Sequence, residues 1–294
     1  MHFLAASESD YLPDEVGPAS AQFDLSAKSG NQAEAMAHFV TGVLEEETHG
    51  PEQALKSYRE VLRLDPGYTE LAIEVAYDYL RRGEATEAIG VLKDALKARP
   101  DEPGPALALS SIYLRHLRKP DLATRYAETA VEADPSRFSA YEALWEIAQA
   151  QGDAAGCAKV LDRAARAKTS NPGFWLQLAD FLANSSDGNA FSDAKTAAKL
   201  NACLDKAAQT AGDDAQSLAR IADFYVLNRQ LAKAVTFYQK AAELKPSMPN
   251  INERLASALI ELGRKEEAIP VLEKIIAANP LSLAAYDQLY VLHE

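Results

Sequence analysis

The prolines of this chain recur at a nearly constant interval. Pro66, Pro100 and Pro135 are 34 and 35 residues apart, and Pro246 and Pro280 are again 34 apart. Each follows apolar residues at helical spacing, and proline ends a helix because it lacks the amide donor and restricts the residue before it. A period of this length indicates tandem structural repeats, so the 294 residues are not divided into globular domains by length alone.

Two segments that end at these prolines show what one repeat contains. Residues 69–100 and 249–280 each begin with apolar residues at helical spacing, which break at Gly83 and Gly263 and then resume. This pattern predicts a helix, a tight turn and a second helix. Small alanines at matching places in both segments let the two helices approach closely.

The residues at fixed offsets within this unit resemble the tetratricopeptide repeat. The second unit carries the pattern clearly, with Val75, Ala76, Tyr79, Gly83, Ala88, Leu92, Ala95 and Pro100. Seven tandem units match it, three of them closely. The resemblance implies an all-α fold, a right-handed α-solenoid of about seven helix-turn-helix repeats plus a terminal helix. The expected solenoid spans 31–294, with repeats at 34–67, 68–101, 102–136, 137–171, 172–213, 214–247 and 248–281 and the terminal helix at 282–294.

Three units depart from the family's pattern. The third has one extra residue near its turn. The fourth carries Trp145 where a small residue is usual, so its helices are expected to be splayed or shifted locally. The turn of the fifth is lengthened to residues 184–193, and its second helix lacks a closing proline.

Two segments lie outside the repeats. Residues 1–30 are polar and contain prolines and glycines, which predicts an extended or partly disordered arm; Phe3, Tyr11 and Phe23 would let it fold back over the stack. Residues 282–294 read as the first helix of an eighth repeat with more than one apolar stripe. Because a capping helix needs a polar outer face, we expect either that the native chain continues beyond Glu294 or that a second copy covers this end.

The sequence carries no motif for catalysis, a cofactor or a metal. It contains no phosphate-binding loop, dinucleotide fingerprint, HExxH or GxSxG, and its five histidines and two cysteines have no metal-ligand spacing. Cys157 and Cys203 are expected to be small hydrophobic residues of helices. We therefore predict a protein without enzymatic activity that needs neither a cofactor nor a metal ion.

A partner surface follows from the resemblance, because in this family the first helix of each repeat lines a concave groove. Residues four apart share one helical face, which selects a stripe along the first helices. Its N-terminal part is apolar or neutral and its C-terminal part acidic. The stripe consists of Phe39, Ile73, Tyr77, Leu107, Ser111, Glu142, Glu146, Asp180, Asp223, Glu253 and Asp287, with Leu176 and Ala219 also on it.

The character of this stripe predicts its ligand. Exposed apolar side chains mark partner sites, and a row of carboxylates attracts lysine or arginine. We expect a protein or peptide segment that is apolar at one end and basic at the other. The alternative is that these positions are ordinary solvated or interhelical ones. Some members of the family capture a terminal carboxylate with basic residues here, but Phe39, Val43 and Tyr77 hold those places.

Net charge narrows the class of partner. The formal charge of −13 argues against nucleic acid and against an anionic membrane surface, and no apolar run is long enough to insert in a membrane. The leading hypothesis is a protein-interaction scaffold. Its rivals are the regulatory or substrate-recruiting arm of a larger enzyme such as a glycosyltransferase, and a helical-repeat RNA binder. Self-association through the terminal helix stays open. A cytoplasmic location is slightly favoured, with a periplasmic or secreted one if a signal peptide was removed.

Overall fold

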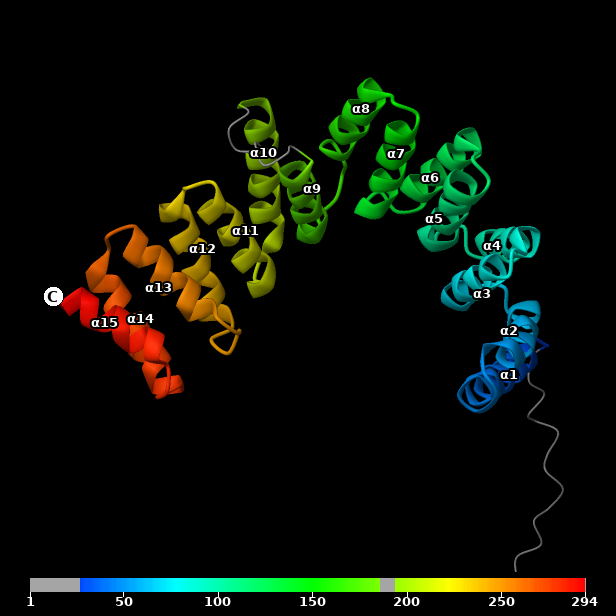
Figure 1. The fold of residues 1–294 in the computed structure, drawn as a ribbon, viewed down its shortest axis with the longest axis horizontal. Coiled ribbons are helices and arrows are strands. Elements are labelled where there is room, and N and C mark those ends of the chain that lie inside the picture. The colour runs from blue at the N-terminus through cyan, green and yellow to red at the C-terminus, as the bar shows by residue number, and fades with distance from the viewer. Residues whose placement is uncertain (1–26, 186–193, 294) are drawn as a thin grey trace, which may run out of the picture. The chain divides into compact units, whose positions relative to one another are not determined.

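The computed structural model describes residues 27–185 and 194–293. Within these ranges the chain forms helices joined by short turns and contains no strand (Figure 1). The chain divides into two compact units, which meet in sequence between Ala98 and Arg99. The arm predicted for 1–30 lies outside the described residues up to position 26, and its last four residues belong instead to the first helix, which begins at Ala27.

The first unit contains two helical hairpins. Consecutive helices pair, and the second helix of the first hairpin also contacts the first helix of the next. The helices are α1 (Ala27–His49), α2 (Pro51–Leu64), α3 (Thr69–Arg81) and α4 (Ala85–Ala98).

The second unit continues the same pairing through five further hairpins and ends on an additional helix. Its elements are α5 (Pro103–Ser111), η1 (Ile112–His116), α6 (Pro120–Ala133), α7 (Phe138–Ala150), α8 (Ala154–Ala164), α9 (Pro172–Asn184), α10 (Ala194–Ala211), α11 (Ala215–Leu227), α12 (Leu231–Leu244), α13 (Ile251–Glu261), α14 (Lys265–Ala278) and α15 (Leu283–His293). The first helices α5, α7, α9 and α11 also contact one another in series. An all-helical, hairpin-by-hairpin fold is thereby confirmed for the described residues.

Buried alanines set how closely the helices of a hairpin approach. Ala76 and Ala88 in the first unit, and Ala256 and Ala268 in the second, expose 1% of their surface or less. Side chains at these places face the partner helix, so a larger residue would force the helices apart. At Gly42 of α1 even an alanine would not fit, because a Cβ built there would lie 2.5 Å from Cε1 of the Tyr58 ring.

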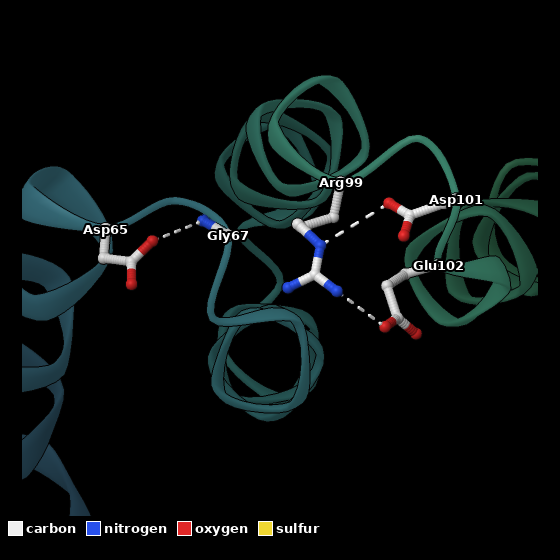
Figure 2. A network of polar contacts seen from close by, with 5 residues as sticks. All are labelled: Asp65, Gly67, Arg99, Asp101 and Glu102. Carbon is white, nitrogen blue, oxygen red and sulfur yellow. Dashed lines mark hydrogen bonds and ion pairs between the residues drawn. The ribbon is translucent and has the colours of Figure 1, made fainter.

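The prolines of the repeat act together with the residue before them. Asp65 is the C-terminal cap of α2, and its Oδ1 accepts a hydrogen bond of 3.1 Å from the amide of Gly67 (Figure 2). Oδ1 of Asp134 likewise accepts a hydrogen bond of 2.9 Å from the amide of Ser136. Oδ1 of Asn279 accepts one of 3.2 Å from the amide of Leu281. Each side chain thereby fixes the turn between repeats.

At Pro100 the preceding residue is Arg99, which cannot accept hydrogen bonds from the turn. Its guanidinium reaches forward instead, from Nε to Asp101 at 3.5 Å and from Nη2 to Glu102 at 3.0 Å (Figure 2). Glu102 is the residue at the N-terminal cap of α5. The contact therefore ties the turn to the start of the next helix.

Within a hairpin, the turn uses a residue in the left-handed region. Gly83, Gly152 and Gly263 have φ values of 71° to 79°, a range that costs glycine no steric strain. The following amide closes each turn on a carbonyl five residues back, as from Glu84 to Tyr79 at 2.9 Å.

The extra residue of the third repeat is absorbed by a π-helical turn. The chain passes from α5 into η1, where the amide of Leu117 bonds to the carbonyl of Ile112, and the closing bond from Lys119 to Tyr113 spans six residues instead of five. A π turn holds one more residue than an α turn, so the helix keeps its direction and the hairpin still closes. The fourth repeat differs in another way: α8 buries only Ala164, fewer residues than any other described second helix.

Candidate protein-binding surface

The first unit places its predicted site residues on α1 and α3. Phe39 is half-buried, because its ring meets Tyr58 at 6.0 Å and Tyr68 at 5.6 Å between centroids. Ile73 is also half-buried, whereas 41% of Tyr77 is exposed. Packing thus uses part of the predicted apolar stripe, and Tyr77 is its most accessible member.

Sequence reasoning missed a broader apolar surface on α1. Met36, Val40 and Leu44 are 62%, 52% and 56% exposed and follow one another every four residues, so they form one stripe of the helix. Beside them a pocket of about 310 Å³ is lined by Met36, Phe39 and Tyr68 among others. Exposed apolar side chains in such a group are typical of an interaction surface.

In the second unit the neutral part of the stripe lies on α5. Leu107 and Ser111 are both half-buried. Two further positions do not belong to an accessible surface: Leu176 on α9 is 1% exposed and Ala219 on α11 is 2% exposed. Both sit in helices that contact neighbouring first helices, since α9 contacts α7 and α11, and both side chains point into the stack.

Three of the predicted carboxylates are bound by arginines from a neighbouring repeat. Arg115 donates from Nε and Nη2 to the two oxygens of Glu146, at 3.1 and 3.0 Å. Arg220 of α11 pairs with Asp180 of α9. The geometry of Arg115 is the bidentate arrangement that fits a carboxylate best.

The third pair involves a tyrosine as well. Arg254 of α13 reaches Asp223 of α11 at 3.1 Å, and the hydroxyl of Tyr238 donates to the same carboxylate at 2.5 Å. Burial, followed by this hydrogen bond, raises the pKa of Tyr238 well above its ordinary value. These arginines connect successive repeats and cancel much of the acidic charge expected of the stripe.

The other three predicted carboxylates keep their charge on the surface. Glu142, Glu253 and Asp287 have exposed side chains. Across residues 27–185 and 194–293 none of the three is in an ion pair with lysine or arginine. They therefore set the local electrostatic field of the stripe more than the paired residues do.

Glu142 differs from the other two because it lines a pocket between α7 and α9. The pocket has a volume of about 390 Å³ and is lined by Phe138, Glu142, Trp145, Gln177, Asp180, Phe181, Asn184 and Ser185. Phe138, Glu142 and Trp145 form one stripe of α7, spaced four and three residues apart, and the remaining residues form the facing stripe of α9. Partial burial raises the pKa of the Glu142 carboxyl above its ordinary 4.5.

Aromatic rings form the wall of this pocket. Trp145 meets Phe181 edge to face with centroids 5.0 Å apart, and Phe138 meets the same ring at 5.7 Å. Trp145 is only half-buried. Sequence reasoning treated it as a misfit in the packing of the fourth repeat; the spacing of Phe138, Glu142 and Trp145 was the signal that could have indicated a pocket.

Among the residues that the structure describes, no three His, Cys, Asp or Glu side chains come together as metal ligands, and no helix is long and apolar enough to cross a membrane. Both cysteines are unpaired; burial raises the pKa of Cys203 to about 11 and also raises that of Cys157. Neither thiol is therefore activated as a nucleophile.

Comparisons with known proteins agree with this fold. A tetratricopeptide repeat model matches residues 225–291, and the model of the ChAPs (Chs5p-Arf1p-binding proteins) matches residues 20–171, just over half of the chain. The 131 kDa subunit of transcription factor tau from Saccharomyces cerevisiae is 26% identical over 158 residues; the match covers 54% of this chain but 14% of that protein.

Solved structures with similar folds have low sequence identity. Yeast Tom70 is 18% identical with a TM-score of 0.48, over 92% of this chain and 55% of Tom70. The C-terminal part of a TPR repeat-containing protein from Cytophaga hutchinsonii is 14% identical with a TM-score of 0.47, over 85% of this chain and 99% of that one.

The two family models indicate a protein-interaction scaffold, and scaffolds of these families are generally non-catalytic. The assignment follows from the repeats, from the pairing of the helices and from the ChAPs family model, which matches more than half of the sequence. The chain belongs to the tetratricopeptide repeat proteins and, within them, to the family of the ChAPs.

Proposed function

We propose that this protein is a non-catalytic scaffold that holds a segment of a partner protein along the first helices of its repeats. The observation that carries the proposal is the serial contact of α5, α7, α9 and α11, whose accessible side chains include the unpaired carboxylate of Glu142. A continuous row of this kind suits an extended or helical segment better than a small molecule.

Each unit, taken by itself, would offer a different kind of contact to a partner. The first unit offers the apolar side chains of α1 together with Tyr77. The second offers Glu142, Glu253 and Asp287, which would attract basic residues and accelerate encounter. We therefore expect partner segments that contain separate apolar and basic stretches.

The names of similar proteins support a protein as the partner. The ChAPs family is named for binding Chs5p and Arf1p, and the relative in transcription factor tau is a subunit of a protein assembly. We propose the same class of partner for this chain, without assigning it either of those proteins.

A charge-reversal pair tests the surface. The test variant carries Glu253→Lys and Asp287→Lys on the first helices α13 and α15; the control carries Glu243→Lys and Glu273→Lys on the second helices α12 and α14. All four residues are exposed, and the two variants change the net charge equally. Partners captured by the intact chain would be identified by cross-linking mass spectrometry, and the Kd of a purified partner measured for each variant.

We expect the first-helix variant to weaken binding at least tenfold, with cross-links on the first helices and the control unchanged. Equal weakening in both variants would mean that only net charge matters. Cross-links confined to second helices would place the surface elsewhere and overturn the proposal.

A further inference from the structure

The pocket between α7 and α9 combines aromatic walls with carboxylates, and this combination is selective for a particular kind of ligand. Its volume of about 390 Å³ is near the lower end of the range for ligand sites, which suits a single side chain better than a cofactor. We propose that it binds one arginine side chain of the partner segment. This inference rests on the proposed function, since the arginine is presented by a protein.

The carboxylates determine the sign of the ligand's charge. Glu142 and Asp180 both line the pocket. Asp180 is engaged by Arg220, but Glu142 has no ion pair with any lysine or arginine in the described part of the chain. Burial raises the pKa of both carboxyl groups. Arg220 lowers the pKa of Asp180, but by less than burial raises it. A cation would relieve this cost, whereas an anion or an apolar group would increase it.

The rings favour a guanidinium over an ammonium ion. Trp145 is half-exposed and lines the pocket together with Phe181, so aromatic rings border the space that a flat cation would enter. Arginine stacks on aromatic faces and donates two parallel hydrogen bonds to one carboxylate, which lysine cannot do. The second unit also shows that a cation can lie over a tryptophan ring, because the ammonium of Lys206 is 4.1 Å from the centre of the Trp175 ring.

The position of the pocket adds to its specificity. It lies between the first helices α7 and α9, with Glu146 one turn farther along α7 and bound by Arg115. Because that neighbouring carboxylate is neutralised, the unpaired charge is concentrated at Glu142. An arginine would thereby fix the register of the partner segment on the stack.

Fluorine NMR provides a direct test with the whole chain. Trp145 and Trp175 are the only tryptophans, so labelling with 5-fluorotryptophan gives two signals, and Trp145→Phe assigns them. The probe is the tripeptide acetyl-Gly-Arg-Gly-amide. Its matched ligand is the same tripeptide with citrulline, which keeps the shape of arginine but carries no charge. The variants are Glu142→Gln and, as control, Glu146→Gln.

We expect the arginine tripeptide to shift the Trp145 signal in a saturable way, at least fivefold more weakly in Glu142→Gln and unchanged in Glu146→Gln. The citrulline tripeptide should not saturate. Equal shifts with both tripeptides, no loss in Glu142→Gln, or shifts confined to Trp175 would overturn the inference.

The same variants separate this inference from the proposed function. If Glu142→Gln binds a purified partner normally while the Glu253→Lys, Asp287→Lys variant does not, the first-helix surface stands and the arginine pocket is wrong. If neither variant affects the partner but the tripeptide still saturates Trp145, the pocket binds arginine and the groove model is wrong.

Discussion

Both units join neighbouring repeats through aromatic contacts, but they differ in where their ion pairs lie. In the first, Phe39 of α1 packs against Tyr68 at the start of α3, and the two ion pairs among residues 27–98 each join residues of one helix. In the second, arginines of one repeat bind carboxylates of a neighbouring repeat, as Arg220 does with Asp180. Both units expose apolar side chains, on α1 in the first and on α15 in the second, so the ion pairs between repeats are what distinguishes the second unit.

This difference shows that counting charges along a helical face overstates its field. Glu146, Asp180 and Asp223 belong to the predicted acidic row, but each has an arginine partner. The charge available to a ligand is that of the carboxylates without such a partner, Glu142, Glu253 and Asp287. In the first unit aromatic packing likewise withdraws Phe39 from the surface while α1 exposes side chains that no repeat position predicts.

The largest effect should come from the cores, where the units are alike. Leu92 of α4 and Leu204 of α10 are both completely buried. Replacing either with alanine removes apolar contacts and leaves a cavity, which costs about 2–5 kcal/mol. Urea denaturation should show a loss of this size for both variants. A loss below about 1 kcal/mol in one unit would mean that the cores differ as well as the faces.

Two glycines of the first unit should respond to alanine with opposite signs. In Gly42→Ala the new Cβ meets the ring of Tyr58, so overpacking of about 1–3 kcal/mol should exceed the gain in helix propensity. In Gly90→Ala nothing lies within 4 Å of the Cβ, and stability should rise by about 0.5–1 kcal/mol. Thermal unfolding measures both. Stabilisation by Gly42→Ala would show that α1 and α2 can move apart freely.

The ion pairs between repeats should contribute little stability each. Arg220→Gln in the second unit and Arg63→Gln in the first both break a solvent-exposed pair, and each should cost less than about 1 kcal/mol. Urea denaturation in 0.05 M and 1 M NaCl should show both losses shrinking with salt. A loss for Arg220→Gln that persists in 1 M NaCl would show that the pair between repeats is shielded from solvent ions.

The smallest effect concerns Glu142. Its pKa is raised in the folded protein, so the folded state holds the proton more tightly than the unfolded state does. The carboxyl therefore favours folding below its ordinary pKa of 4.5 and loses this contribution as the pH rises through the folded-state value. Glu142→Gln should consequently raise the Tm slightly at pH 7, and the difference should vanish below pH 4. A lower Tm at pH 7 would indicate that a cation of this chain already occupies the pocket.

The sequence determined the repeat itself. The repeat is marked by prolines 34 residues apart, turn glycines and paired alanines. These residues act on a few neighbours in the sequence, so their effect can be predicted without the tertiary structure. The extra residue of the third repeat was visible for the same reason. How it is accommodated was not, because the choice between a longer turn and the π turn of η1 depends on how α5 and α6 pack.

Only the tertiary structure decided what the face of the stack presents. Arg220 pairs with Asp180 across 40 residues, and Trp145 lines a pocket because Phe181 of the next repeat stands beside it. Helix phase predicts which way a side chain points, but not which long side chain of a neighbouring repeat reaches it. Local patterns fix the helices, whereas charge and access on a shared surface depend on residues that become neighbours only when the repeats stack.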